Sequence, residues 1–139
     1  MRYRRVCGAL LLVCLLTLGA CVHRATLSGT SWKLRQLTLA GSTQQLVPTA
    51  PITLQFQQSG ATYVGSSGCN YYSGSYTVSG DQLHLQFTGV TARACAGPIM
   101  SQEVSYLKAL DNVHTFEMYG QMLTLKGDSD RPVLVFEAT

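Results

Sequence analysis

The chain has 139 residues, of which 46% are hydrophobic and 12% are charged, with a formal net charge of +3. Three of the ten basic residues lie in the first five positions, so seven basic and seven acidic residues remain over the rest of the chain. This length suits one domain with a sizeable core. The balanced charge gives no basic patch for nucleic acid and no acidic run for cationic partners, and we expect no nucleic-acid partner.

Residues 1–20 have the order of a secretory signal peptide. Three arginines come first, an apolar run covers Val6–Leu18, and the small residues Gly19 and Ala20 follow. The apolar run has 13 residues, whereas a membrane-spanning helix requires roughly 20. A single-pass anchor is therefore the weaker interpretation of this segment.

The end of the signal, "LGAC" at Leu18–Cys21, resembles a bacterial lipobox. The resemblance implies cleavage before Cys21, a diacylglycerol group on its sulfur and acylation of the new amino group. Several acyl chains on one residue hold a protein durably on a membrane. We therefore expect a lipidated tether over residues 21–28. In a Gram-negative cell, Val22 favours sorting to the outer membrane, facing the periplasm.

Two cysteines remain unassigned once the signal and the lipid are accounted for, namely Cys69 and Cys95. In an oxidising compartment two such cysteines usually pair, and the bond would close a loop of about 27 residues. A thiolate nucleophile would require a nearby histidine and an electropositive site. A metal site would require further ligands at matched spacing, and no CxxC or HxxxH pair occurs. The sequence therefore favours a Cys69–Cys95 disulfide over these two alternatives.

Hydrophobic residues alternate with polar ones along most of the remaining chain. Ile52–Gln57 and Gln82–Phe87 each place three apolar residues on one face, and "TFEMY", "MLTLK" and "VLVFEA" repeat the pattern near the C-terminus. Such alternation is typical of half-buried strands, and Gly-containing turns separate the segments. The sequence predicts a mainly β (α+β) domain, an antiparallel meander that forms a partly open β-barrel.

Gly97–Asn112 departs from this alternation and has the spacing of a helix. Met100, Val104, Leu107 and Leu110 recur at intervals of three or four residues, which indicates one apolar helical face. Gly97 is expected as the N-cap, with Pro98 in the first turn, and Asn112 is expected to end the helix in the left-handed conformation. We expect this helix to pack its apolar face against the barrel.

Taken in order, the segments "LSGTSWKL", "GCNYYSGSY" and "TARACAGPIMSQEVSYLKAL" resemble the META/HslJ family of small bacterial lipoproteins. The resemblance covers nearly all of Leu27–Phe136, and we assign residues 29–139 to this domain. The matching positions are Gly29, Thr30, Trp32, Leu34, Gly68, Cys69, Asn70, Gly74, Tyr76, Thr91, Ala94, Cys95, Met100, Glu103, Leu107 and Leu110. Tyr71 and Tyr72 follow the GCN segment, where a basic or small residue is common in the family.

The resemblance implies a partly open β-barrel with one helix, and links to heat shock, to novobiocin tolerance and to virulence or secretion. No enzymatic activity is established for the family. The titratable residues of the chain agree with this expectation, because they form no catalytic pattern in the sequence. They are interpreted as surface or capping residues, namely His23, His84, Glu103, Asp111, His114 and Glu117.

The sequence and this resemblance therefore favour a non-enzymatic envelope lipoprotein with a role linked to stress response or antibiotic tolerance. We expect it to act by binding a protein or a small apolar molecule, with no metal and no cofactor. The alternative is a periplasmic inhibitor or secretion-pilot module that acts on a protein partner. Tyr71 and Tyr72 are the candidate binding surface, since tyrosine is enriched at recognition surfaces. Packing within strands is the competing interpretation of these tyrosines.

Overall fold

The computed structural model describes residues 26–139, so the predicted signal peptide and Cys21 lie outside the described residues. Within this part, no helix is long and apolar enough to cross a membrane. The elements in chain order are β1 (Ser31–Leu39), β2 (Ser42–Thr43), β3 (Thr53–Phe56), β4 (Thr62–Ser66), β5 (Tyr71–Ser79), β6 (Gln82–Val90), α1 (Gly97–Asp111), β7 (Thr115–Tyr119), β8 (Met122–Lys126), the 3-10 helix η1 (Asp128–Asp130) and β9 (Pro132–Ala138).

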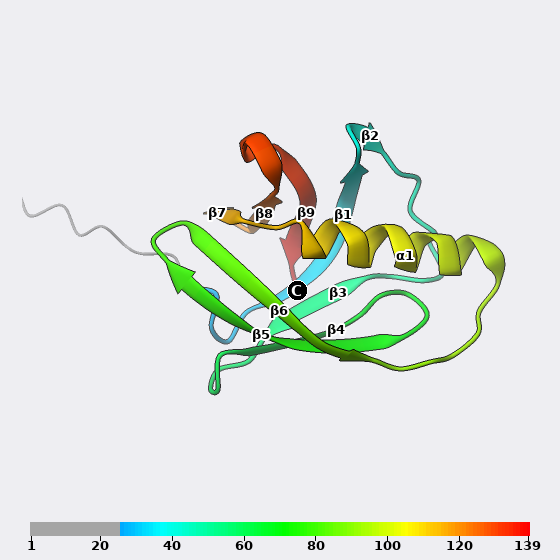
Figure 1. Cartoon of the computed structure of the whole chain (residues 1–139), viewed down its shortest axis with the longest axis horizontal. Coiled ribbons are helices and arrows are strands. Elements are labelled where there is room, and N and C mark those ends of the chain that lie inside the picture. Colours follow the sequence, from blue (N-terminus) through cyan, green and yellow to red (C-terminus); the bar gives the residue numbers. More distant parts are fainter. Residues whose placement is uncertain (1–25) are drawn as a thin grey trace, which may run out of the picture.

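The strands form one antiparallel sheet that closes into a barrel of eight strands. β1 pairs with β3 through its first residues and with β9 along most of its length. A register shift between Leu34 and Gln36 bends β1, as bulges do at barrel corners. The short β2 lies outside this ring and pairs only with the end of β1. The prediction of a mainly β barrel with one helix is confirmed, and the ring of strands is closed (Figure 1).

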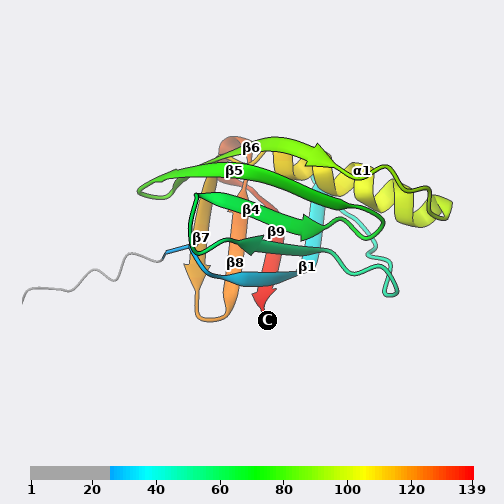
Figure 2. The ribbon, with the colours of Figure 1, turned by 90° about the horizontal axis from the view of Figure 1, so that it is seen from below.

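The ring closes at a very narrow seam between β6 and β7. These two strands share a single residue pair, Gln82 with Thr115, whereas β5 and β6 share eight. Figure 2 shows the reason, because β4, β5 and β6 run one way and β7, β8 and β9 run across them. Beyond Gln82 the two strands diverge, and α1 runs beside β6.

The alternation predicted from the sequence places the core on the inner face of the barrel. In β3 and just before it, Ile52, Leu54 and Phe56 are all buried. In β6 the burial decreases along the strand: Leu83 is buried, Leu85 is half-buried, and Phe87 is 45% exposed. The end of β6 is therefore apolar on its inner face without being covered by the core.

Two glycines on neighbouring strands make room for tyrosine rings in the core. Tyr63 of β4 is paired with Gly74 of β5, and Gly65 of β4 is paired with Tyr72 of β5. A Cβ atom at Gly74 would lie 2.3 Å from the ring of Tyr63, and one at Gly65 would lie 2.4 Å from the hydroxyl of Tyr72. The two rings thus lie over the bare backbone of the opposite strand, which is a known way to stabilise glycine within sheets.

The structure corrects the predicted core face of α1. Val104 was expected to face the barrel but is 64% exposed. Leu110 of the predicted face is buried as expected, and the other buried residues of the helix are Gln102, Glu103, Tyr106 and Ala109. The polar residues of this face have partners beside the helix, and the amide of Gln102 bonds the backbone of Val47 and Ala50 in the loop between β2 and β3.

The predicted helix ends also differ from the structure. Ala96 is the N-cap, Gly97 is already helical, and Asn112 has φ of −91°, outside the left-handed region. The backbone N–H of Asn112 bonds the carbonyl of Ala109, and that of Val113 bonds the carbonyl of Leu110, so the helix ends without a left-handed residue.

Candidate functional site

The GCN segment and the helix meet at a buried polar cluster centred on Glu103. The carboxylate of Glu103 accepts hydrogen bonds from the hydroxyl of Ser67, from the backbone N–H of Asn70 at 2.9 Å and from the side-chain amide of Asn70 at 2.8 Å. All three residues are buried. Glu103 was interpreted from the sequence as a surface residue, and the structure shows instead that it joins α1 to the start of β5.

Asn70 extends this cluster to the segment that leads from β6 into α1. Its side-chain oxygen accepts hydrogen bonds from the hydroxyl of Thr91 at 2.8 Å and from the backbone N–H of Arg93 at 2.7 Å. Among the described residues, no buried side-chain nitrogen or oxygen lacks a hydrogen-bond partner. The buried polar atoms of the cluster therefore all have hydrogen-bond partners within the protein. Such a network rigidly links the elements that contribute to it.

The predicted disulfide is present beside this cluster. Cys69 and Cys95 are bonded, with their Cα atoms 6.0 Å apart, within the usual range for disulfides. Cys69 precedes β5 and Cys95 precedes α1. The bond and the Glu103 cluster together hold the beginning of α1 against the segment before β5.

The two tyrosines proposed as a binding surface lie in different environments. Tyr72 is 2% exposed, and its hydroxyl donates to the carbonyl of Thr53 at 2.7 Å and lies 2.5 Å from the hydroxyl of Tyr106. Burial raises the pKa of Tyr72 well above its ordinary value. Tyr71 is 65% exposed on the outer face of β5. Tyr72 is therefore a core residue, and only Tyr71 remains available at the surface.

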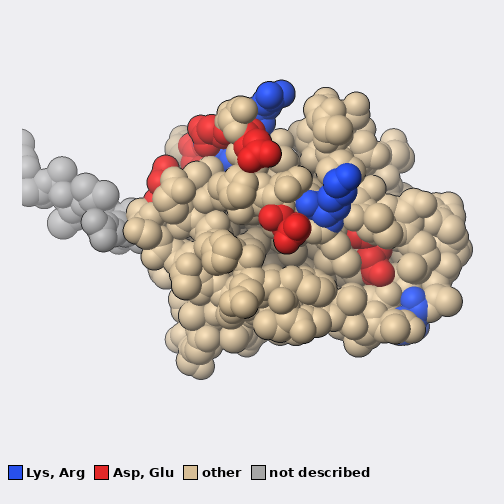
Figure 3. Space-filling model, in the orientation of Figure 1, with Lys and Arg blue, Asp and Glu red and all other residues tan. Residues whose placement is uncertain are grey.

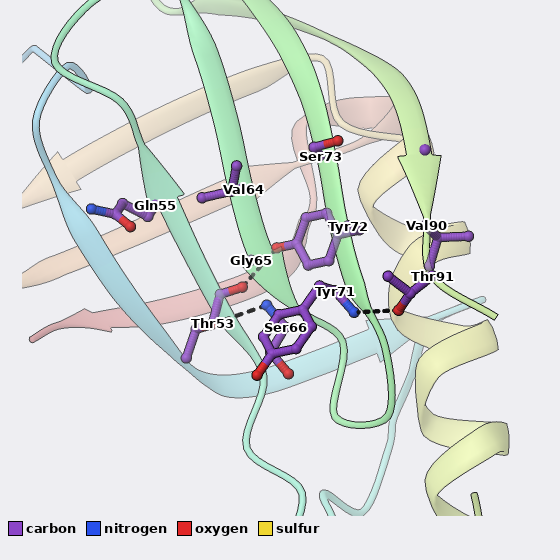
Figure 4. A pocket seen from close by; sticks show the side chains of 11 residues that line it. Thr53, Gln55, Val64, Gly65, Ser66, Tyr71, Tyr72, Ser73, Val90 and Thr91 are labelled. Carbon is purple, nitrogen blue, oxygen red and sulfur yellow. Dashed lines mark hydrogen bonds between the residues drawn. The ribbon is translucent and has the colours of Figure 1, made fainter. Parts of the chain in front are cut away.

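Tyr71 borders a shallow hollow on the outer face of β3–β6, which we call the outer hollow (Figure 4). It has a volume of about 510 Å³, and its lining carries no charged side chain. Hydroxyl groups of serine and threonine dominate the polar part of its surface. It is lined by Thr53, Gln55, Val64, Gly65, Ser66, Tyr71, Tyr72, Ser73, Gly89, Val90 and Thr91.

A second cavity lies between β6 and α1, and we call it the β6–α1 groove. Its volume is about 320 Å³. Phe87 and Val90, which are 45% and 44% exposed, form one wall together with Leu85, and Leu107 and Leu110 form the other. The lining consists of Tyr63, Leu85, Phe87, Val90, Leu107, Lys108, Leu110 and Asp111.

The groove exists because β6 and β7 diverge. Leu85 and Phe87 are paired with Tyr76 and Gly74 of β5, so their side chains lie on the inner face of the barrel. A full β6–β7 ladder would cover that face, but the ladder ends after one residue pair. Helix α1 covers only part of it, which leaves apolar side chains open to solvent between strand and helix.

Two charged residues of α1, Lys108 and Asp111, line the groove, and both are exposed. Burial and the nearby Asp111 raise the pKa of Tyr63, at the bottom of the groove, to about 12. Its phenol therefore stays neutral at physiological pH. Charged side chains are sparse on the face shown in Figure 3, and most of that surface is uncharged.

The two histidines that the structure describes lie at the surface. Within residues 26–139, no three His, Cys, Asp or Glu side chains come close enough to hold a metal ion. His114 lies 3.2 Å from Asp128 at the surface, and His84 is exposed on β6. The two cavities are thus the features that offer binding, and the lining of the β6–α1 groove contains the larger share of aliphatic and phenylalanine side chains.

Comparison with known families agrees with the arrangement of the motif residues. A family model described as the META domain matches residues 25–139. The chain belongs to the META domain family. The GCN segment, the second cysteine and Glu103 are the residues that the structure joins through the disulfide and the buried cluster. In this META domain, these motif residues hold the helix in place.

Solved structures with a similar fold come from two bacteria. An NMR structure of a protein from Burkholderia xenovorans has a TM-score of 0.69 and 31% identity, covering 81% of this chain and 83% of that chain. A crystal structure of a DUF4847 family protein from Bacteroides vulgatus has a TM-score of 0.52 and 18% identity, covering 62% of this chain and 57% of that chain. No curated protein matches the chain significantly.

The sequence did not indicate the groove. The sequence predicts that Leu85 and Phe87 lie on the core-facing side of a strand and that Leu107 lies on the core face of a helix. Hydrophobic periodicity marks which residues share a face, but it does not show whether a neighbouring strand covers that face.

Proposed function

We propose that this META domain protein is a non-catalytic lipoprotein of the bacterial cell envelope that binds an apolar group in the β6–α1 groove. In this proposal Cys21 carries the lipid, and the domain faces the periplasm from the outer membrane. No cofactor or metal takes part, and nucleic acid is not a partner. The observation that carries the proposal is the set of apolar side chains left open between β6 and α1.

The lipid anchor is supported by the "LGAC" segment, which places Cys21 directly after a short apolar run. The Cys69–Cys95 disulfide suits the oxidising compartment that such a signal would reach. A Cys21→Ala variant should leave the membrane fraction or remain an uncleaved precursor. If this variant is cleaved and fractionates with membranes as the wild-type protein does, the lipoprotein part of the proposal is wrong.

Binding in the groove is supported by the exposed apolar surface of its walls and by its volume. Phe87 and Val90 each leave more than two-fifths of their surface in water, and covering apolar area contributes about 25 cal/mol per Å². Partly polar clefts of a few hundred Å³ are typical ligand sites. An alkyl chain or an apolar side chain of a partner would therefore gain free energy by entering the groove.

Native mass spectrometry of the lipidated protein, released from detergent, tests this binding. A co-purifying ligand should be present with the wild-type protein and absent with the Phe87→Arg variant, because the arginine would place a charge in the apolar wall of the groove. Val78→Arg is the matched control, since Val78 is 44% exposed but lies outside the groove lining. Ligand retained by Phe87→Arg at the level of Val78→Arg would refute the groove as the site.

One observation favours the alternative function, a periplasmic inhibitor or secretion-pilot module. Tyr71 is 65% exposed beside the outer hollow, and exposed tyrosines are frequent in protein interfaces. A Tyr71→Ala variant should keep its melting temperature and lose a stoichiometric partner in a pulldown from solubilised envelopes. An unchanged partner would remove the outer hollow from consideration as that interface.

A further inference from the structure

The second half of β6 has an open edge towards α1. On one side β6 pairs with β5 along its whole length, from Gln82 to Val90. On the other side the ladder with β7 contains only Gln82, and the N–H of Leu83 bonds the carbonyl of His114. Among residues 26–139, no strand pairs with that edge beyond this point. Such an edge is a template for a further strand.

The backbone groups at this edge are those of Leu85 and Phe87. Successive residues of a strand direct their N–H and C=O groups to opposite sides, and Leu83 directs its N–H to β7. Leu85 and Phe87 therefore direct theirs to the same, open side. The carbonyl of Gln86 lies next to Gly74 of β5, which agrees with this assignment.

The open edge and the β6–α1 groove adjoin each other. Phe87 contributes its backbone to the edge and its side chain to the groove. Across the groove, α1 presents Leu107, Lys108 and Asp111, and the 64% exposed Val104 lies on the same helical face one turn away. Recognition domains that bind extended peptides combine these two elements, an open strand edge and neighbouring pockets for alternate side chains.

We propose that the β6–α1 groove binds an extended peptide segment that pairs with the edge of β6 as an additional antiparallel strand. Its alternate residues are apolar and lie against Phe87, Val90 and Leu107. This inference rests on the proposed groove-binding function and names its partner as a polypeptide. Of the contact residues named, only Val90 also borders the outer hollow.

Helix α1 fixes the direction of that segment. α1 runs back along β6 in the opposite direction (Figure 1), so a strand antiparallel to β6 runs parallel to α1. The apolar side chains of the segment point into the groove, and its polar side chains, at the intervening positions, point away from it.

Amide hydrogen exchange of the full-length lipidated protein in phospholipid nanodiscs tests the proposal. The probe is the capped peptide Val-Thr-Val-Glu-Val-Lys-Val. Binding should slow exchange at the amides of Leu85 and Phe87 at least about tenfold, because each gains a hydrogen-bond partner.

Two controls separate strand pairing from simple apolar contact. A peptide N-methylated at the amides that face β6 keeps its side chains but loses its donors, and it should bind at least tenfold more weakly. In the protein, Phe87→Arg should abolish the protection, whereas Val78→Arg should preserve it. Equal binding of the methylated peptide, or protection that survives Phe87→Arg, would overturn the proposal.

The test also distinguishes this inference from the groove function on which it rests. If an alkyl ligand occupies the groove in native mass spectrometry but the peptide protects neither Leu85 nor Phe87, the partner is not a strand and the groove function stands. If neither the ligand nor the peptide depends on Phe87, both proposals fail.

Discussion

Glu103 is the only buried carboxylate among residues 26–139, and it meets three donors with no cation beside it. Its two oxygens accept hydrogen bonds from the Ser67 hydroxyl and from the backbone and side-chain amides of Asn70. A buried polar group is tolerated when each of its hydrogen bonds is made. At this scale, Glu103 serves to position the helix on the barrel.

Replacing Glu103 with Gln tests this role. Glutamine has one oxygen, so its NH₂ group would face the side-chain NH₂ of Asn70, which is also a donor. Glu103→Gln should lower the free energy of unfolding by about 1–3 kcal/mol, measured by urea denaturation. Glu117→Gln is the matched control and should change it by less than about 1 kcal/mol, since Glu117 is exposed beside Lys126. Equal effects of the two substitutions would contradict the structural role of Glu103.

Gly74 offers a second test at the residue scale. An added Cβ would lie 2.3 Å from the ring of Tyr63 and 2.4 Å from the carbonyl oxygen of Gln86, so the packed tyrosine would have to move. Gly74→Ala should lower the melting temperature, at a cost of about 1–3 kcal/mol. Gly89→Ala in the adjacent strand should cost little, because no atom lies within 4 Å of its Cβ position. A neutral Gly74→Ala would show that the ring does not cover this strand.

At the scale of elements, the position of α1 is set by two different kinds of link. Its polar side chains bond the loops around it, and the disulfide ties the segment before it to the segment before β5. Its apolar face is divided, with Leu110 in the core and Leu107 beside the groove. The helix can therefore close one end of the barrel and still leave the inner face of β6 accessible.

The disulfide should contribute substantially to stability, since it joins residues 26 positions apart. In the chain-entropy description such a link contributes on the order of 3.5 kcal/mol. Cys69→Ser, Cys95→Ser and the double variant should each lower the free energy of unfolding by about 2–4 kcal/mol. The three losses should be nearly equal, because each variant removes the same bond. A double variant that loses clearly more than either single variant would show separate roles for the two cysteines.

At the scale of the whole molecule, the core is joined by aromatic residues from distant parts of the chain. Tyr106 of α1 contacts Tyr72 of β5 and Phe136 of β9, with ring centroids 5.6 and 6.5 Å apart. Burial raises the pKa of Tyr106 and of Tyr72, and burial with the nearby Asp111 raises that of Tyr63 to about 12. The fold therefore depends on neutral phenols in its interior.

This dependence predicts loss of stability at alkaline pH. The pKa of Tyr63 rises from 10.0 to about 12 on folding. The contribution of its neutral phenol to the free energy of unfolding is therefore complete below pH 10 and is lost as the pH rises from 10 to 12. Tyr72 and Tyr106 act in the same direction. The free energy of unfolding should fall above pH 10 by up to about 1.4 kcal/mol per pH unit for each tyrosine.

Urea denaturation at a series of pH values measures this fall, and Tyr106→Phe should make it shallower. The Lys126 ammonium, whose pKa is raised mainly by its hydrogen bond to Glu117, acts in the same direction and is still present in that variant. A free energy of unfolding that stays constant between pH 10 and 11 would contradict the burial of neutral phenols.

The sequence by itself determined the class of fold, the main strands, the extent of the helix and the disulfide. These features depend on local alternation, on turn residues and on a count of cysteines, all of which are properties of neighbouring positions along the chain. Ile52, Leu54 and Phe56 are buried as predicted, because a strand with one apolar face must cover it. The family resemblance was also visible at this level, since its motif residues occur in a fixed order.

Only the tertiary structure decided which faces the neighbouring elements cover. Glu103 and Tyr106 face the barrel and Val104 faces solvent. The reason is that their hydrogen-bond partners, Asn70 and Tyr72, lie on the barrel side although they are distant in the sequence. The divergence of β6 from β7 left Phe87 exposed, although its strand pattern is the same as that of the buried Leu83. Hydrophobic periodicity shows which side chains share a face, whereas the path of distant strands determines whether another element covers that face. In this protein β7 leaves the inner face at the end of β6 uncovered, and the groove lies there.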